Sequence, residues 1–381
     1  MGKWPMMRLG EIIEIKKGTK IEPCDNLNGN IRYIQIEDLR SNNNIKFCSG
    51  SENKRYVIAD EEDLIIAWDG ANAGTIGYGL NGAIGSTLAL LRVCKKGIFD
   101  VRYLGEYLKS KFDYLQQNCT GATIPHINRL ILENIKVPVP PIIVQKHVAD
   151  TLDKTQEIID GYKKLLAELD NLVMAVFYEM FGDPGTNDKN WEVVKIKDLA
   201  KKIQYGTSKK ASTEKLEYPI LRMNNITYSG ELDLSDLKYI SLSDKEKEKY
   251  LVHKGEILFN RTNSKELVGK CAVFKYDYPM AYAGYLIKLT PNEKTNGEFI
   301  SAFLNSKYGK ALLKSMAKNI IGMANINAKE LGNIRIYFPP LDLQNKFADI
   351  VTKIEEQKAL VKQAISESEH LFNSLMSEYF D

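Results

Sequence analysis

Polar side chains suited to nucleic acid gather in one predicted loop of the second half of the chain. Asn260–Lys265 directly follows the apolar run Ile257–Phe259, so we expect five hydrogen-bonding side chains and a lysine to emerge together from a strand end. Arginine pairs bidentately with guanine and asparagine with adenine, while threonine, serine and lysine suit phosphates or base edges. A hydrophilic surface loop would have the same composition. The candidate DNA-binding residues are Asn260, Arg261, Thr262, Asn263, Ser264 and Lys265.

Three other segments have a composition that fits the same kind of surface. Trp68–Asn72 takes the corresponding place in the first half of the chain. Lys16–Lys20 and Tyr205–Lys210 combine positive charge with hydroxyl groups, as contacts to backbone phosphates require, although solvated turn lysines would look alike. The candidates here are Lys16, Lys17, Thr19, Lys20, Trp68, Asp69, Asn72, Thr207, Ser208, Lys209 and Lys210.

A last pair of segments, Thr123–Arg129 and Gly322–Asn327, completes this set. Its candidates are Thr123, His126 and Asn128. His126 is either a reader of bases or a hydrogen-bonded structural histidine, because an imidazole serves both purposes.

No catalytic or metal-binding residues are expected. The glycine-rich stretch Gly70–Gly79 lacks a following Gly-Lys-Ser/Thr and the dinucleotide spacing, so we interpret its glycines as turns between strands. The acidic run Asp60–Asp63 is interpreted as a solvated turn rather than a nuclease centre. A methyltransferase would need an Asn/Asp-Pro-Pro-aromatic segment, which is absent. The five cysteines are scattered without zinc-knuckle spacing and are expected to be reduced and mostly buried.

The sequence elements that are expected to position these loops occur twice along the chain. In each half an aromatic residue opens a run that closes on Gly-Thr, at Gly18–Thr19 and Gly206–Thr207. Towards the end of each half, Pro140–Pro141, Gln145 and Phe181 recur 199 residues later as Pro339–Pro340, Gln344 and Phe380. So many matches at one offset indicate an internal repeat with a variable globular part and a more uniform C-terminal part.

The uniform part of each copy predicts a long helix with a heptad seam. After each proline pair, apolar residues recur at alternating steps of four and three, and proline is tolerated at the first turn of a helix but not inside it. Two polar residues, Lys358 and Ser368, interrupt the second seam. The predicted interface residues are Val148, Leu152, Ile159, Tyr162, Leu166, Leu169, Val173, Val176, Phe347, Val351, Ile354, Val361, Ile365, Phe372 and Leu375.

Each seam must be buried, and the nearest matching seam belongs to the other copy. We therefore expect the two helices, each about 40 residues or about 60 Å long, to pair as an antiparallel coiled coil. The alternative is that each helix docks only on its own globular part. Gly182–Asp188 has the composition of a helix stop and linker.

The globular parts predict a mixed α/β (α+β) fold with β-rich cores. Strand-like runs occur at 33–36 and 63–66 in the first copy and at 220–223 and 256–259 in the second, with one helix around 101–114 and one around 297–316. The predicted domain organisation is 1–139 and 184–338 as globular domains, with spacer helices at 140–183 and 339–381.

Composition and charge exclude several classes of protein. With 381 residues, 44% hydrophobic and 27% charged, the chain has the balance of a globular protein with room for two cores. It lacks a stretch of about 18 uncharged apolar residues, and Met1–Arg8 lacks the apolar region of a signal peptide, so we expect a cytoplasmic protein without a membrane partner. The net charge of +3 is mild, so any nucleic-acid footprint must be local.

With the repeat, the seams and these loops, the chain resembles the specificity subunit of type I restriction–modification enzymes over its full length. The most specific segments are 121–145 (GATIPHIN…LENIKVPVPPIIVQ), 331–344 (LGNIRIYFPPLDLQ), 63–77 (DLIIAWDGANAGTIG) and 256–270 (EILFNRTNSKELVGK). The second copy has Gly-Met-Ala-Asn at 322–325 where the first has Thr-Ile-Pro-His. His126 is therefore not expected to have a functional role that both copies share.

The resemblance implies two target-recognition domains that each read one half of a split sequence in double-stranded DNA. It implies that the helix pair sets the length of the unread gap and that the chain has no catalysis of its own. The implied partners are two methyltransferase subunits, which use S-adenosylmethionine on adenine, and restriction subunits, which use ATP and Mg²⁺; no cofactor is expected on this chain itself.

Three alternatives remain at this point. One is the specificity component of a type IIB or IIG-like restriction–modification system. Another is an enzyme that acts alone on nucleic acid, which would show activity without partners. The third is a structural coiled-coil adaptor without DNA readout, in which changes to the loops would leave the choice of DNA untouched.

Overall fold

The computed structural model describes residues 4–24, 29–40, 45–50, 56–95, 97–121, 123–264, 269–320 and 323–380. The chain forms two compact units. The first comprises Met1–Gly161 and Ala364–Asp381, and the second comprises Tyr162–Gln363. Each unit therefore combines one globular part with a portion of both long helices, and each is described by itself.

The first globular part is built on two four-stranded sheets. One has the order β2-β9-β6-β7 and is antiparallel throughout, and the other has the order β4-β3-β8-β5 with a parallel β3–β8 pair. A short antiparallel pair, β1-β10, lies next to the start of the long helix α4. The elements are β1 (Met6–Arg8), β2 (Ile13–Lys17), β3 (Ile31–Ile34), β4 (Lys46–Cys48), β5 (Ile58–Ala59), β6 (Leu64–Ala67), β7 (Ile76–Tyr78), β8 (Gly82–Ile84), β9 (Leu88–Val93), α1 (Val101–Ser110), α2 (Phe112–Gln117), α3 (Arg129–Glu133), β10 (Lys136–Pro138) and α4 (Ile142–Phe181).

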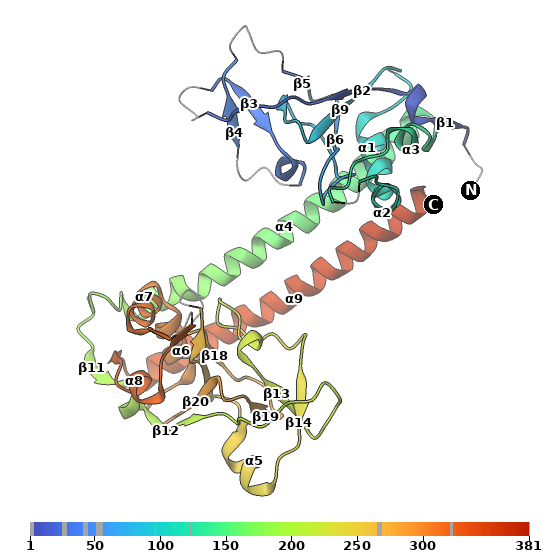
Figure 1. The fold of residues 1–381 in the computed structure, drawn as a ribbon. Coiled ribbons are helices and arrows are strands. Elements are labelled where there is room, and N and C mark those ends of the chain that lie inside the picture. The colour runs from blue at the N-terminus through green and yellow to red at the C-terminus, as the bar shows by residue number, and fades with distance from the viewer. Residues whose placement is uncertain are drawn as a thin grey trace. The chain divides into compact units, whose positions relative to one another are not determined.

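The second globular part repeats this topology strand for strand. Figure 1 shows both globular parts as ribbons with their strands and short helices. Its sheets have the orders β12-β20-β16-β18 and β14-β13-β19-β15, with β13–β19 parallel, and a β11-β23 pair. A three-stranded sheet, β17-β22-β21, is added. The elements are β11 (Glu192–Lys195), β12 (Ala200–Tyr205), β13 (Tyr218–Leu221), β14 (Lys238–Ile240), α5 (Asp244–Tyr250), β15 (Leu251–Val252), β16 (Ile257–Asn260), β17 (Thr262–Asn263), β18 (Cys271–Val273), β19 (Met280–Tyr282), β20 (Leu286–Pro291), α6 (Gly297–Asn305), α7 (Lys307–Met316), β21 (Lys318–Ile320), β22 (Met323–Asn325), α8 (Ala328–Gly332), β23 (Arg335–Phe338) and α9 (Leu341–Phe380).

The predicted mixed α/β fold and internal repeat are confirmed, and three local predictions need correction. Each copy has two short helices where one was expected, because the helix is interrupted at Lys111 in the first copy and at Ser306 in the second. The hydroxyl of Ser306 caps α7. In the runs at 33–36 and 220–223 the strands end at Ile34 and Leu221, and short 3₁₀ turns begin at Ile36 and Met223. Asp63 is not solvated, because it is 2% exposed and accepts a hydrogen bond from Arg92 Nε at 2.9 Å.

The recurring glutamine of the repeat has a structural reason. Gln145 is fully buried; its Nε2 donates to Pro140 O at 2.9 Å, and its Oε1 accepts from Asp100 N at 2.9 Å. In the second copy Gln344 donates to Pro339 O at 2.8 Å and accepts from Asn296 N at 2.9 Å. Each glutamine thus ties the start of a long helix to the start of a short helix in its own domain, α1 in the first copy and α6 in the second.

Helices α4 and α9 run antiparallel, as expected from the seams. In the second unit, the end of α4 and the beginning of α9 share one core, in which Phe177 and Phe347 have ring centroids 5.9 Å apart. In the first unit, Leu152 near the start of α4 shares a core with Phe372 near the end of α9. All fifteen predicted seam residues are buried or half-buried.

The last phenylalanine of each helix packs into the domain formed by the other copy. Phe181 ends α4 and lies 5.0 Å from the ring of Phe299 in the second unit. Phe380 ends α9 and lies 5.5 Å from the rings of both Tyr103 and Tyr107 in the first unit. Docking of each helix only on its own globular part is therefore wrong, and the recurrence of this phenylalanine in the repeat is explained.

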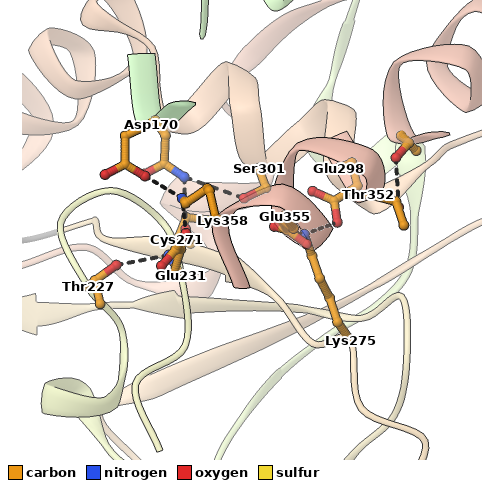
Figure 2. A network of polar contacts seen from close by, with 12 residues as sticks. Asp170, Thr227, Glu231, Cys271, Lys275, Glu298, Ser301, Thr352, Glu355 and Lys358 are labelled. Atoms are coloured by element: carbon orange, nitrogen blue, oxygen red, sulfur yellow. Dashed lines mark hydrogen bonds and ion pairs between the residues drawn. The ribbon is translucent and has the colours of Figure 1, made fainter. Parts of the chain in front are cut away.

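Lys358, one of the two polar interruptions of the second seam, is buried in an ion-pair network (Figure 2). Its ammonium pairs with Asp170 on α4 and with Glu231 in a loop of the second globular part. Burial by itself lowers the pKa of Lys358, but the hydrogen bonds to these two carboxylates outweigh it and raise that pKa. Lys275 forms a neighbouring pair with Glu298 at 2.8 Å. One buried charge at a seam position specifies the register of a helix pair.

Replacing Lys358 with methionine is expected to destabilise the second unit by roughly 3 kcal/mol, because two carboxylates lose their shared cation. The value is at the low end for a broken buried pair, since Asp170 and Glu231 are 40% and 27% exposed. Urea unfolding followed by circular dichroism measures the change. Lys353→Met, at an exposed position of α9, is the matched control; equal midpoints for the two variants would contradict the role of the pair.

Candidate nucleic-acid interface

Three segments that sequence analysis singled out meet at one end of the first sheet. Lys17 is the last residue of β2, Asp69 follows β6, and His126 lies in the loop before α3. Asp69 accepts from both neighbours, with Lys17 Nζ at 3.0 Å from Oδ2 and His126 Nδ1 at 2.6 Å from Oδ1. The Lys17 and His126 side chains are 52% and 47% exposed, so the ammonium of Lys17 and the imidazole of His126 both reach solvent. We call these three residues the first cluster.

The carboxylate of the first cluster is held in its charged form. Burial raises the pKa of Asp69, but the hydrogen bonds from His126 and Lys17 outweigh this effect and leave the pKa below its ordinary value. The backbone of His126 is also paired, with its N–H donating to Thr120 O at 2.7 Å. The loop closes through Gly121, whose φ of +97° favours glycine. The Asp69 carboxylate therefore orients the imidazole as well as the lysine.

The corresponding end of the second sheet carries a different set of side chains. The guanidinium carbon of Arg261 lies 4.8 Å from the ring centroid of Tyr205, the last residue of β12. Arg261 Nη2 donates to Asn325 Oδ1 at 3.1 Å. The hydroxyl of Tyr205 accepts from Ala328 N at 2.9 Å, which fixes the ring. Stacking and a hydrogen bond together hold this arginine in one orientation. We call Tyr205, Arg261 and Asn325 the second cluster.

The expectation that the side chains of Asn260–Lys265 emerge together is wrong. Asn260 is fully buried because β16 continues through it, and Thr262 is 6% exposed because β17 pairs with β22. Arg261, between them, is half-buried at the surface, and so is Ser264. Lys265 and the side chain of Asn263 lie outside the described residues.

Two other candidates have structural roles, and a third has a buried hydroxyl. Thr207 is 4% exposed, and its hydroxyl accepts from Lys209 N at 3.1 Å. Asn128 caps α3 by accepting from Leu130 N at 3.1 Å. The hydroxyl of Thr19 is buried. The predicted phosphate contacts from the hydroxyls of Thr19 and Thr207 do not fit their buried positions. The predicted base contact from Asn128 does not fit its role as a helix cap.

The remaining candidates lie at the surface around the clusters. Lys16 pairs with Glu14 at 3.2 Å, and Lys209 Nζ donates to Ser241 O at 2.8 Å. Trp68 and Asn72 are half-buried. The remaining exposed candidates are Lys20, Thr123, Ser208 and Lys210.

Sequence reasoning missed two members of the second cluster. Tyr205 began the candidate segment Tyr205–Lys210 but was not itself chosen as a candidate, and no candidate was chosen from Gly322–Asn327, the segment that contains Asn325. The available signal was positional, because Tyr205-Gly-Thr matches Lys17-Gly-Thr and Asn325-Ile-Asn matches His126-Ile-Asn.

Within the described residues, no group of three or more His, Cys, Asp or Glu side chains could hold a metal ion. No helix in that same part of the chain has the length and apolarity needed to cross a bilayer. All five cysteines are free thiols, but only Cys48 and Cys271 are buried and Cys94 is exposed, so the expectation that most are buried is wrong.

Comparison with known protein families identifies the same two-fold division of the chain. The family model of the type I restriction modification DNA specificity domain matches twice, at residues 1–171 and 188–370. The two matches coincide with the two copies of the repeat.

Similar proteins include specificity subunits from archaea and bacteria. The type I restriction enzyme MjaVIII specificity subunit of Methanocaldococcus jannaschii is 28% identical over 398 residues, covering 98% of this chain and 92% of the relative. The EcoKI specificity subunit of Escherichia coli K12 is 22% identical, covering 84% and 74%.

Two solved structures share the fold. The S subunit of a type I restriction–modification system from M. genitalium has a TM-score of 0.61 at 16% identity, covering 100% of this chain and 96% of that chain. A structure from work on complex assembly and conformational transition of the type I system has a TM-score of 0.59 at 17% identity, covering 100% and 98%.

Proposed function

Because this chain belongs to the type I restriction modification DNA specificity family, we propose that its two domains read the two halves of an asymmetric, split DNA site. The first cluster reads one half and the second cluster reads the other. The helix pair joins the two readers and sets the length of the gap that neither domain reads.

The observation that carries this proposal is the chemical difference between the two clusters. The second presents an arginine pre-oriented by a tyrosine and an asparagine, which suits the O6 and N7 acceptors of guanine. The first presents a lysine and an imidazole around a carboxylate. Identical readers related by a two-fold axis would specify a palindrome, whereas unlike readers specify an asymmetric site.

The proposed partners are two methyltransferase subunits and restriction subunits. An exposed apolar stripe on α4 supports protein docking there. Leu165 and Leu172, both in the second unit, are seven residues apart and are 40% and 42% exposed, each one position before a half-buried seam residue. Apolar side chains that a helix pair leaves uncovered at regular spacing favour a further helix against them.

The double variant Leu165→Asp/Leu172→Asp is expected to abolish recruitment of the methyltransferase subunits while the chain stays folded, because both side chains are exposed. Co-purification and the mass of the complex by light scattering measure the loss. Ala167→Asp/Ala175→Asp places the same charges at other exposed positions of α4 and should assemble normally. Full assembly of the leucine variant would exclude this stripe as the docking surface.

In this proposal the chain contributes no catalysis. S-adenosylmethionine binds to the methyltransferase subunits, and ATP and Mg²⁺ bind to the restriction subunits. The purified chain alone should therefore neither methylate nor cleave DNA.

Genome-wide mapping of methylated adenines, with and without this gene, tests the function. We expect one asymmetric two-part motif to lose methylation when the gene is deleted. An unchanged methylation map in cells that carry active methyltransferase subunits would favour an adaptor without DNA readout. Neighbouring genes for a separate methyltransferase and an ATP-driven translocase would distinguish a type I system from a type IIB or IIG-like one.

A further inference from the structure

We propose, on the basis of the function above, that specificity in each domain resides in four equivalent positions on one backbone frame. These reading positions include one residue per domain, Thr87 and Tyr285, that no motif indicated. The reading positions are Lys17, Trp68, Thr87 and His126 in the first domain and Tyr205, Arg261, Tyr285 and Asn325 in the second.

The first part of the frame is the junction between two neighbouring strands. In the first domain Gly18 N donates to Leu88 O at 2.9 Å, and in the second domain Gly206 N donates to Leu286 O at 3.1 Å. The residue before each glycine, Lys17 or Tyr205, ends the edge strand of its sheet. These two residues therefore occupy the same place in the two folds.

The second part of the frame joins the other three positions. Trp68 N donates to Thr87 O at 2.8 Å, and Arg261 N donates to Tyr285 O at 3.1 Å. The carbonyls of Trp68 and Arg261 each accept one further bond at 2.9 Å, from the amides that follow His126 and Asn325. The same three backbone segments are thus bonded in the same order in both domains.

Strand register places three of the four positions at the same end of each sheet. In the second domain Ile287 is opposite both Tyr205 and Phe259. Arg261 directly follows β16, and Tyr285 lies in the turn that directly precedes β20, so both positions lie at the end of the sheet where Tyr205 ends β12. In the first domain Ala89 is opposite Lys17 and Ile66, which places Trp68 and Thr87 in the same way.

The frame is constant while all four side chains differ. Lysine is replaced by tyrosine, tryptophan by arginine, threonine by tyrosine and histidine by asparagine. Thr87 is exposed, and Tyr285 is 55% exposed although Leu286, the next residue and the first of β20, is fully buried. An exposed tyrosine opposite a pre-oriented arginine is placed to contact the base or phosphate next to the guanine that the arginine reads.

Exchange of Thr87 and Tyr285 between the domains tests this inference in the assembled methyltransferase complex. Methylation rates are measured on duplexes that carry every single-base change in either half of the mapped site. Tyr285→Thr should alter base preference by about tenfold or more in the second half-site only, and Thr87→Tyr should do so in the first half-site only. Tyr278→Thr, at another exposed tyrosine (52%) of the second unit, should leave both unchanged.

The outcomes separate this inference from the proposed function. If both exchanges leave all base preferences unchanged while Arg261→Ala alters the second half-site, the reading positions fail and the function stands. If Arg261→Ala and both exchanges leave every preference unchanged, the clusters do not read DNA and the proposed function fails as well. A change in the wrong half-site would also overturn the assignment.

Discussion

Replacing Arg261 with alanine in the assembled complex is expected to reduce methylation at the cognate second half-site by about 5- to 150-fold relative to variant sites. This range corresponds to the loss of one bidentate base contact, about 1–3 kcal/mol. The side chain is held by Tyr205 and Asn325 rather than by the core, so the variant should fold and assemble normally. Methylation kinetics on duplexes with each base in turn measure the effect.

Two further variants, Asn325→Ala and Arg335→Ala, test whether the effect of Arg261→Ala comes from base readout. Asn325→Ala removes one hydrogen bond to the guanidinium and should give a smaller change at the same base. Arg335→Ala removes an exposed arginine of β23 and should give no change. Equal effects of Arg261→Ala and Arg335→Ala would indicate a general loss of positive charge rather than base readout.

The second large effect is expected from Phe177→Ala, which should destabilise the second unit by about 3–5 kcal/mol. Phe177 is fully buried and is the centre of an aromatic group. Its ring lies 5.3 Å from Phe181, 5.9 Å from Phe347 and 6.2 Å from Phe299. Truncation leaves a cavity where α4, α9 and the second domain meet in one core.

Urea unfolding monitored by fluorescence and circular dichroism measures this loss. Leu172→Ala, at an exposed position of the same helix, is the control and should change the unfolding midpoint little. A small effect of Phe177→Ala would mean that the aromatic group does not hold the end of α4 to the second domain. Loss of subunit recruitment should accompany the unfolding, because the docking stripe lies on the same helix.

Local rules explain the parts of the fold that could be predicted from the sequence. Both long helices begin directly after the proline pairs, at Ile142 and Leu341, because proline is accommodated only in a first helical turn. The first ends before Gly182, whose φ of +81° is typical of a helix stop. The antiparallel pairing followed from two matching seams in one chain.

The candidate site was predicted only in outline, because exposure at a strand end depends on pairing with distant strands. Asn260 and Thr262 belong to a polar run, but strands far along the chain bury them. The side chain of Arg261, between them, lies at the surface and donates a hydrogen bond to Asn325, 64 residues away. Nothing in the local composition separates these three neighbours.

The sequence by itself determined the duplication, the mixed α/β class, the boundaries of the two long helices and the apolar seams, since these depend on residue spacing and backbone geometry within short segments. Tertiary structure alone decided which polar residues form the two clusters, which carboxylates neutralise Lys358 and where each terminal phenylalanine is buried. These depend on contacts between residues 50 to 130 positions or more apart, such as Asp69 with His126 and Lys358 with Glu231, whose partners are chosen by folding. Short-range propensity carries no information about such pairs.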